Sequence, residues 1–280
     1  MSSSFYGGGS GARRKRGIMP TKFSIIIICK NAADTIDRTL QSVRGVSDDI
    51  VVYDSGSTDD TVRFVEGVGL PVHRGPWLGF GATRRAATEL ARYDWVFCLD
   101  ADEWMGVHLA DALAELTPRP GTAYSVRLAN FLGKRRIRWG GWGRDRRVRY
   151  FHRREYNWNL ALIHEKVLPL GGTARTQLLP GSLFHRTARS VADYRAKLRG
   201  YAPLVAEAYR RQGRKPTLFK QLLSPLAAFC KDYFLRLGLL EGVAGFQLAW
   251  AAAGYTWRKY QYLKQPALLR PLSSQDSELP

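Results

Sequence analysis

Cysteine is scarce in this sequence, and the spacing of the few cysteines excludes two structural classes. The 280 residues contain only Cys29, Cys98 and Cys230, with no CxxC pair. A disulfide framework or a structural zinc site requires more cysteines at closer spacing. Two of the three lie inside apolar runs, so we expect buried, reduced thiols.

Acidic residues are few relative to basic ones. The chain has 24 Asp and Glu against 43 Lys and Arg, a formal net charge of +19. This excess predicts an anionic partner, which composition leaves open as nucleic acid, an anionic membrane or a phosphorylated substrate. The hydrophobic fraction of 45% is enough for one large domain, or for one domain with a smaller appendage.

A basic N-terminal stretch followed by an apolar run superficially suggests a secretory signal. Residues 1–19 are rich in Gly and Ser and then basic, and we expect them to be disordered. The apolar run 23–29 that follows lacks a small-residue cleavage site and continues into Lys30 and Asn31. A buried strand is therefore a better interpretation of this run than a signal peptide.

The first half of the chain alternates strand and helix patterns. Expected strands are 23–29, 50–53, 70–73 and 95–99; expected helices are 33–43, 58–65 (with Ser57 and Asp60 as a capping box) and 80–92. This order predicts an α/β fold with an open, mostly parallel sheet. In such sheets the ligand site lies beyond the carboxyl ends of the strands.

The pattern changes after about residue 118. Shorter strands are expected at 122–129, 147–152, 162–168 and 182–185, followed by a long helix at 188–212. Residues 217–263 are predicted to be helical and are strongly apolar.

Acidic residues follow two of the predicted strands. Asp54 ends the second strand, and Asp100, Asp102 and Glu103 end or follow the fourth. Mg²⁺ and Mn²⁺ prefer carboxylate oxygens together with substrate phosphates. Such acids can also be helix caps and solvated turns, an alternative left open for Asp59 and Asp60. An acidic cluster directly after an apolar strand favours a bound cation.

Six segments carry a family resemblance. Residues 22–105 resemble the nucleotide-sugar-binding half of the family-2 glycosyltransferases with the GT-A fold, through SIIIICKNAADTIDRTLQSV, DSGSTDDT and WVFCLDADE. The segments GPWLGFG (75–81), LIHEK (162–166) and LGLLEGVAGFQLAWAAAGYTWRKY (237–260) are similar to the bacterial branch that includes lipopolysaccharide-core β-glucosyltransferases. The resemblance covers about residues 20–263.

The resemblance implies an inverting transfer of a hexose, glucose from UDP-glucose, to a lipid-linked phosphorylated saccharide such as the lipopolysaccharide inner core. It implies a nucleotide-sugar site at Lys30, Asn31, Asp54, Ser55 and Asp100. It also implies a divalent metal, Mg²⁺ or Mn²⁺, on Asp100 and Asp102. His185 is either a third metal ligand or a structural histidine.

An inverting enzyme needs a general base for the acceptor hydroxyl. Many members of the family carry this base in an acidic motif beyond the metal site. The common Glu-Asp form of that motif is missing here, and His164-Glu165 stands on an expected apolar strand instead. Glu165 is the candidate base, because apolar walls raise a carboxylate pKa. The alternatives are an ordinary ion pair from Glu165 to an Arg, and Glu103 as the base.

Residues 134–154 are dense in arginine and interspersed with tryptophan. Arg forks bind phosphate and Trp faces stack on sugar rings. We expect Trp139, Trp142, Arg144 and Arg147 to contact the acceptor, although a surface charge run without a specific role is the usual alternative. Nucleic-acid binding would leave the acidic strand ends unexplained, so no nucleic-acid partner is expected.

The apolar C-terminal region suggests a membrane. Residues 237–257 carry one charge, Glu241, and basic residues flank them. Helices lying in an anionic membrane interface are preferred over a buried cap or a spanning helix. This predicts a peripheral protein on the cytoplasmic face of the inner membrane. The expected division is a disordered 1–19, a GT-A domain 20–212, a docking region 213–268 and a disordered tail 269–280.

Rival functions remain at this point. A polyprenyl-phosphate glycosyltransferase would share the donor site, and a non-catalytic basic membrane adaptor would explain the charge and the apolar tail. A nucleotidyltransferase would need a Gly-rich loop after the first strand, and residues 29–33 are not one.

Overall fold

The computed structural model describes residues 21–160 and 165–265. The expected disordered segments 1–19 and 269–280, and residues 162–164 of one expected strand, lie outside these ranges. The thiols are free as expected: Cys29 and Cys98 are buried, and burial raises the pKa of Cys98 to about 11.

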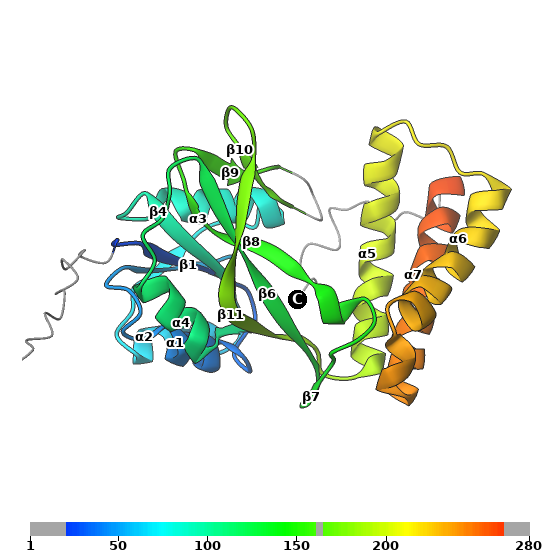
Figure 1. The fold of residues 1–280 in the computed structure, drawn as a ribbon, viewed down its shortest axis with the longest axis horizontal. Coiled ribbons are helices and arrows are strands. Elements are labelled where there is room, and N and C mark those ends of the chain that lie inside the picture. Colours follow the sequence, from blue (N-terminus) through cyan, green and yellow to red (C-terminus); the bar gives the residue numbers. More distant parts are fainter. Residues whose placement is uncertain (1–20, 161–164, 266–280) are drawn as a thin grey trace, which may run out of the picture.

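The first four predicted strands form the parallel part of one sheet. The central strand β1 (Ser24–Cys29) is buried throughout and pairs with β2 (Ile50–Asp54) on one side and β4 (Trp95–Asp100) on the other. β3 (Val72–Arg74) extends the sheet beyond β2. The α/β fold predicted from the alternating pattern is confirmed (Figure 1).

Helices cover both faces of this parallel part. Residues of α1 (Ile36–Val43) share a core cluster with Ile25 and Ile27 of β1, while Ala87 of α3 (Phe80–Glu89) packs with Ile26 and Ile28 on the other face. The alternation of β1 side chains between two apolar layers explains why its sequence is a continuous apolar run.

The predicted capping box of the second helix is wrong. α2 begins at Thr61 (Thr61–Gly67), and Asp60 makes no side-chain capping bond. Ser57 instead donates its hydroxyl to Asp54, and the Asp59 carboxylate accepts the backbone N–H of Thr61 at 3.0 Å.

The second half of the sheet is mixed. The strand order is β3-β2-β1-β4-β8-β6-β11-β5. β8 (Arg146–His152) runs antiparallel to both β4 and β6 (Thr122–Leu132), and β11 (Arg175–Ala188) runs parallel to β6. β7 (Arg135–Arg136) pairs with β6, while β9 (Tyr156–Trp158) and β10 (Val167–Pro169) form a separate small sheet.

Several element boundaries differ from the prediction. β11 has 14 residues rather than the four at 182–185, and it still includes Ala188. α5 (Val191–Arg211) therefore begins three residues later than predicted, where the Ser190 hydroxyl accepts the N–H of Asp193. β5 (Glu103–Met105) and α4 (Val107–Ala114) lie where the sequence predicted no element. β5 is a strand because β11 pairs with it from 80 residues away.

Three helices stand to one side of the sheet (Figure 1). α7 (Val243–Lys264) packs against both α5 and α6 (Leu218–Cys230). The predicted helical region 217–263 is confirmed, but it is interrupted by a π-helical turn η2 (Lys231–Leu235) and a 3₁₀ turn η3 (Gly238–Glu241). None of the helices in the described part of the chain has the length and apolarity needed to cross a bilayer.

The interruption depends on close backbone contacts. Leu237 and Gly242 both have positive φ, 59° and 60°, which turns the chain between η2 and α7. A Cβ on Gly245 would lie 1.8 Å from the carbonyl oxygen of Gly238. Only glycine permits this approach, so η3 is fixed against the first turn of α7.

Candidate active site

The carboxyl ends of β1, β2 and β4 bring the predicted donor-site residues to one edge of the sheet. Cys29 of β1 is level with Asp54 of β2, and Ile28 is level with Asp100 of β4. Lys30 and Asn31 follow β1, and Asp102 lies two residues beyond β4. The parallel register therefore produces the grouping that the sequence predicted.

The loops after β1 and β2 are bound to each other. Asn31 adopts a positive φ of 50°, its Oδ1 accepts the N–H of Thr58 at 2.8 Å, and its own N–H donates to Ser57 Oγ at 2.9 Å. These bonds fix the two loops that flank the predicted nucleotide site.

Asp54 shapes this region from inside. Its side chain is buried, and Oδ2 accepts the N–H groups of Gly56 and Ser57 at 3.0 Å each. Ser55 is buried beside it, and its hydroxyl has no hydrogen-bond partner within the described residues. Asp54 therefore builds the loop, while Ser55 leaves a polar atom unsatisfied there.

Asp100 lies between two buried arginines. Arg84 of α3 donates to Asp100 Oδ1, and Arg149 of β8 donates to Oδ2 at 3.1 Å. Only 4% of each arginine is exposed. Burial raises the pKa of Asp100, but the two guanidinium groups outweigh it and hold that pKa well below its usual range.

Asp102 faces His185 of β11. Asp102 Oδ2 and His185 Nε2 are 3.3 Å apart, and the other ring nitrogen, Nδ1, lies 2.9 Å from Asn130 Oδ1. Burial lowers the pKa of His185, but the Asp102 carboxylate outweighs it and raises that pKa above its usual value. Burial likewise raises the pKa of Asp102, and His185 more than reverses the effect.

The Asp102–His185 pair fits a divalent cation that is shared with a substrate. Within residues 21–160 and 165–265 there is no group of three or more His, Cys, Asp or Glu side chains suited to hold a metal alone. Mg²⁺ is commonly held by one or two carboxylates together with substrate phosphates, and Asp102 supplies one such carboxylate. The Asn130 Oδ1 atom accepts the N–H of His185 Nδ1, which leaves Nε2 of a neutral His185 as a metal ligand. Asp100 would first have to leave its arginines, so its metal role stays a prediction.

Glu165 lies just before β10 and not among apolar walls as predicted. Its carboxylate is ion-paired with Arg84, the arginine that also binds Asp100. The alternative of an ion pair is therefore confirmed, and the role of Glu165 as base stays a prediction. Glu103, the second candidate, is 1% exposed, accepts the N–H of Asp100 at 3.0 Å and is ion-paired with Arg149. Its carboxylate is closed to an acceptor hydroxyl.

Sequence reasoning missed three cations of this site. Arg84 lies in a predicted helix to which no role was assigned, and Arg149 belongs to the basic run that was expected to contact the acceptor. Lys197 of α5 interacts electrostatically with Asp102, Tyr201 and Asp100; burial lowers its pKa, but these groups together raise it. The buried acids after β4 were the available signal, because buried charges require partners.

The basic segment 134–154 is not one surface. Arg149 is buried at Asp100, Arg135 pairs with Glu241, and Arg153 and Arg154 both pair with Asp94. Arg147 pairs with Asp145 at 3.2 Å. The arginines of this segment that form no ion pair with any described residue are Arg136, Arg138, Arg144 and Arg146.

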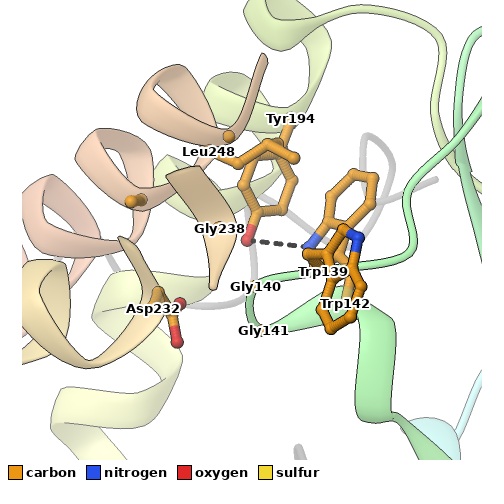
Figure 2. A pocket seen from close by; sticks show the side chains of 10 residues that line it. Trp139, Gly140, Gly141, Trp142, Tyr194, Asp232, Gly238 and Leu248 are labelled. Carbon is orange, nitrogen blue, oxygen red and sulfur yellow. Dashed lines mark hydrogen bonds between the residues drawn. The ribbon is translucent and has the colours of Figure 1, made fainter. Parts of the chain in front are cut away.

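The predicted acceptor tryptophans lie in one loop, residues 137–145, here named the Trp loop. Trp142 is edge-on to Tyr194 of α5, with ring centroids 4.9 Å apart and its Nε1–H 3.4 Å from the Tyr194 hydroxyl (Figure 2). Trp139, Trp142, Tyr194 and Asp232 line a cavity of about 20 Å³. This space holds about one water, so a sugar would have to lie on the open side of the loop.

Comparisons with known proteins show the family of this chain. The family model described as glycosyl transferase family 2 matches residues 24–169. The chain is 30% identical over 272 residues to the lipopolysaccharide core biosynthesis glycosyltransferase LpsC of Rhizobium meliloti, covering 91% of this chain and 97% of LpsC. It is 28% identical to an uncharacterized glycosyltransferase of Rickettsia prowazekii, covering 80% of each.

Among solved structures the similarity is weaker. Glucosyl-3-phosphoglycerate synthase of Mycobacterium tuberculosis, determined with Mn²⁺ and UDP-glucose, is 22% identical with a TM-score of 0.32. The match covers 39% of this chain and 44% of that chain.

Proposed function

Since the chain belongs to glycosyl transferase family 2, we propose that it transfers a hexose, glucose, from a UDP-sugar to a lipid-linked phosphorylated saccharide such as the lipopolysaccharide inner core. The observation that carries the proposal is the pair Asp102 and His185 beside the arginine-bound Asp100 at the strand ends. The similarity to LpsC over nearly its whole length supports the acceptor class.

Each donor residue has a distinct task. Lys30, Asn31 and Ser55 flank the base and ribose on loops that Asp54 holds in shape. Asp102 and His185 would hold a divalent cation, Mg²⁺ or Mn²⁺, which when bound supplies positive charge against the diphosphate. Lys197 adds a fixed positive charge from α5 on the same side.

The transfer itself is a single displacement. The acceptor hydroxyl oxygen forms a bond to the anomeric carbon as the bond from that carbon to the diphosphate oxygen breaks. Glu165 takes the hydroxyl proton, and the diphosphate leaves with the electron pair of the broken bond. The guanidinium of Arg84 pairs with both Glu165 and Asp100, so it holds the base and the donor aspartate in fixed positions relative to each other.

The acceptor is assigned to the Trp loop and its arginines. Trp139 is 38% exposed and offers a ring face to a sugar. Arg144 and Arg147 are exposed and can bind acceptor phosphate.

The helical region supplies the surface for a lipid-linked substrate. Leu218, Phe219, Leu222 and Leu226 of α6 are 59–72% exposed, and η2, η3 and α7 add Leu235, Leu240, Val243 and Trp250. From residue 214 to 264 there are eight basic residues and two acidic ones. Asp232 and Glu241 are both ion-paired with arginines. An apolar face with unopposed basic residues suits an anionic membrane, here the cytoplasmic face of the inner membrane.

Calorimetric titration tests the donor half of the proposal. The protein is titrated with UDP-, GDP- and CDP-glucose, each with and without Mn²⁺. We expect metal-dependent binding of UDP-glucose that is lost in Asp102→Asn and kept in Asp60→Asn, an exposed matched control. Absence of binding for every donor and metal would overturn the proposal and favour a non-catalytic adaptor.

Turnover with vesicle-borne inner-core lipopolysaccharide tests the base. Glu165→Gln should lower kcat at least a hundredfold while UDP-glucose still binds. Turnover near the wild-type rate in this variant would show that another group accepts the proton.

Vesicle sedimentation tests the membrane surface. Binding to phosphatidylglycerol vesicles should fall in Phe219→Asp and Leu222→Asp but not in Val107→Asp, an equally exposed apolar residue on α4. Equal binding of all three variants would show that the lipid contact lies elsewhere.

A further inference from the structure

Asn130 connects the donor site to the Trp loop. It lies in β6, is 2% exposed, and is paired in register with His185 of β11. Its Nδ2 donates to the carbonyl oxygen of Trp142 at 2.8 Å, while its Oδ1 lies 2.9 Å from His185 Nδ1 and 2.8 Å from Thr187 Oγ1. One buried amide thus contacts both halves of the site.

The contacts of Asn130 assign the oxygen and the nitrogen of its side-chain amide. Because Nδ2 has a carbonyl acceptor, Oδ1 must be the atom that faces His185, so His185 Nδ1 carries the proton it shares with Asn130. The lone pair of a neutral ring is then on Nε2, which faces Asp102 at 3.3 Å. Exchanging Oδ1 and Nδ2 by rotating the Asn130 amide would break its bonds to Trp142 and to His185 together.

Apart from the Asn130 side chain, β6 holds the Trp loop only near the two ends of the loop. The N–H of Ile137 donates to the Asn130 carbonyl at 2.9 Å, and the N–H of Leu128 donates to the Asp145 carbonyl at 3.0 Å. The Asn130 side chain reaches the middle of the loop, at Trp142. Its loss would free the Trp142 carbonyl from β6, while Glu241 still accepts the N–H groups of Arg138 and Trp139, and the Arg236 carbonyl still accepts that of Gly140. The part of the loop that is released is therefore 141–145.

We propose that Asn130 is a positioning residue that holds the Trp loop in register with His185, so that a bound acceptor hydroxyl meets the donor carbon. The proposal rests on the proposed function for its catalytic consequence. A loop released at Trp142 would bind the donor normally and place the acceptor poorly. The effect therefore falls on kcat and on the KM for acceptor, and not on donor affinity.

Asn130→Asp separates the two contacts. Aspartate keeps an oxygen for His185 and Thr187 but has no N–H for the Trp142 carbonyl. We expect hydrogen exchange of the amides in 141–145 to rise at least tenfold, with exchange in 183–185 unchanged. UDP-glucose affinity with Mn²⁺ should stay within threefold, and kcat/KM for vesicle-borne inner-core lipopolysaccharide should fall at least tenfold.

Two further variants complete the test. Thr187→Val removes a partner of Oδ1 but leaves the Trp142 bond, so it should keep the slow exchange of the Trp loop. Asn130→Ser is neutral and too short to reach both partners, and it repeats the test if Asn130→Asp does not fold. Unchanged exchange in 141–145, or loss of donor affinity equal to the loss of transfer, would overturn the proposal. If wild type binds no UDP-glucose, the proposed function fails, while the exchange result still decides whether Asn130 holds the loop.

Discussion

Glu241 Oε1 accepts the backbone N–H of Trp139 at 3.1 Å, although the two residues are 102 positions apart in the chain. The same oxygen accepts the N–H of Arg138 at 2.6 Å, and Oε2 pairs with Arg135 at 3.0 Å. The single charge inside the apolar C-terminal segment is thus not an interruption of a membrane surface. It anchors the Trp loop to η3.

Replacing Glu241 should destabilise the protein. Glu241→Ala leaves two N–H groups without an acceptor, and we expect the free energy of unfolding to fall by roughly 2–3 kcal/mol. Urea denaturation measures the change, with Glu115→Ala, an exposed glutamate without an ion pair among the described residues, as control. Equal midpoints for both variants would contradict the anchoring role.

Arg84 should be the most costly side chain of the donor site to remove. Arg84→Met leaves Asp100 and Glu165 without their shared cation, and breaking a buried pair in this way costs about 3–5 kcal/mol. Adding Asp100→Asn should recover part of that loss, because one of the unpaired charges is then removed. A double variant no more stable than Arg84→Met would show that the two residues act independently.

Lys197 should matter for binding and little for stability. It forms no hydrogen bond or ion pair with any residue in the described ranges, yet it lies within electrostatic reach of Asp102 and Asp100. Lys197→Met should keep the free energy of unfolding within about 1 kcal/mol and weaken UDP-glucose about tenfold. Arg195→Met, an exposed position on the same helix, is the matched control in both measurements.

Asp94 should contribute stability that depends on pH. Burial raises its pKa, but Arg153 and Arg154 outweigh this and lower it below the usual value. The unfolded chain therefore takes up the proton first, and the contribution is present above the unfolded pKa and lost as pH falls through the folded pKa. Wild type should exceed Asp94→Asn in unfolding free energy at pH 7, and the difference should shrink below about pH 4. Asp111→Asn, at an exposed aspartate without an ion pair among the described residues, is the control.

Much of the fold could be predicted because its causes are local. The unbroken apolar run of β1 requires burial on both faces, and the acids at the ends of β2 and β4 indicate an edge with a ligand site. Element ends were less predictable where a distant partner decides them. β5 forms only because β11 pairs with it, and Ala188 remains a strand residue because it pairs with Leu132.

The site residues divide in the same way, into those with a local sequence signal and those placed by a distant partner. Asp54, Asp100 and Asp102 were found because acids follow apolar strands. Arg149 could not be separated from its neighbours, since its burial depends on β8 lying beside β4, a pairing with no local signal. Glu165 was predicted to lie between apolar walls because the strand pattern around it is apolar, whereas Arg84 arrives from a helix 81 residues earlier.

The position of β5 at the end of the sheet has a consequence for synthesis of the chain. The turn that carries Asp102 leads directly into β5, and among the described residues β5 has its only sheet partner in Leu183–His185 of β11. A nascent chain that has emerged only as far as β8 already contains Asp100, Asp102 and both buried arginines, but not the strand that fixes this turn. Parallel pairing of β11 with β6 is a slow, non-local step. The donor edge is therefore completed late in translation, after the segment that closes it has left the ribosome.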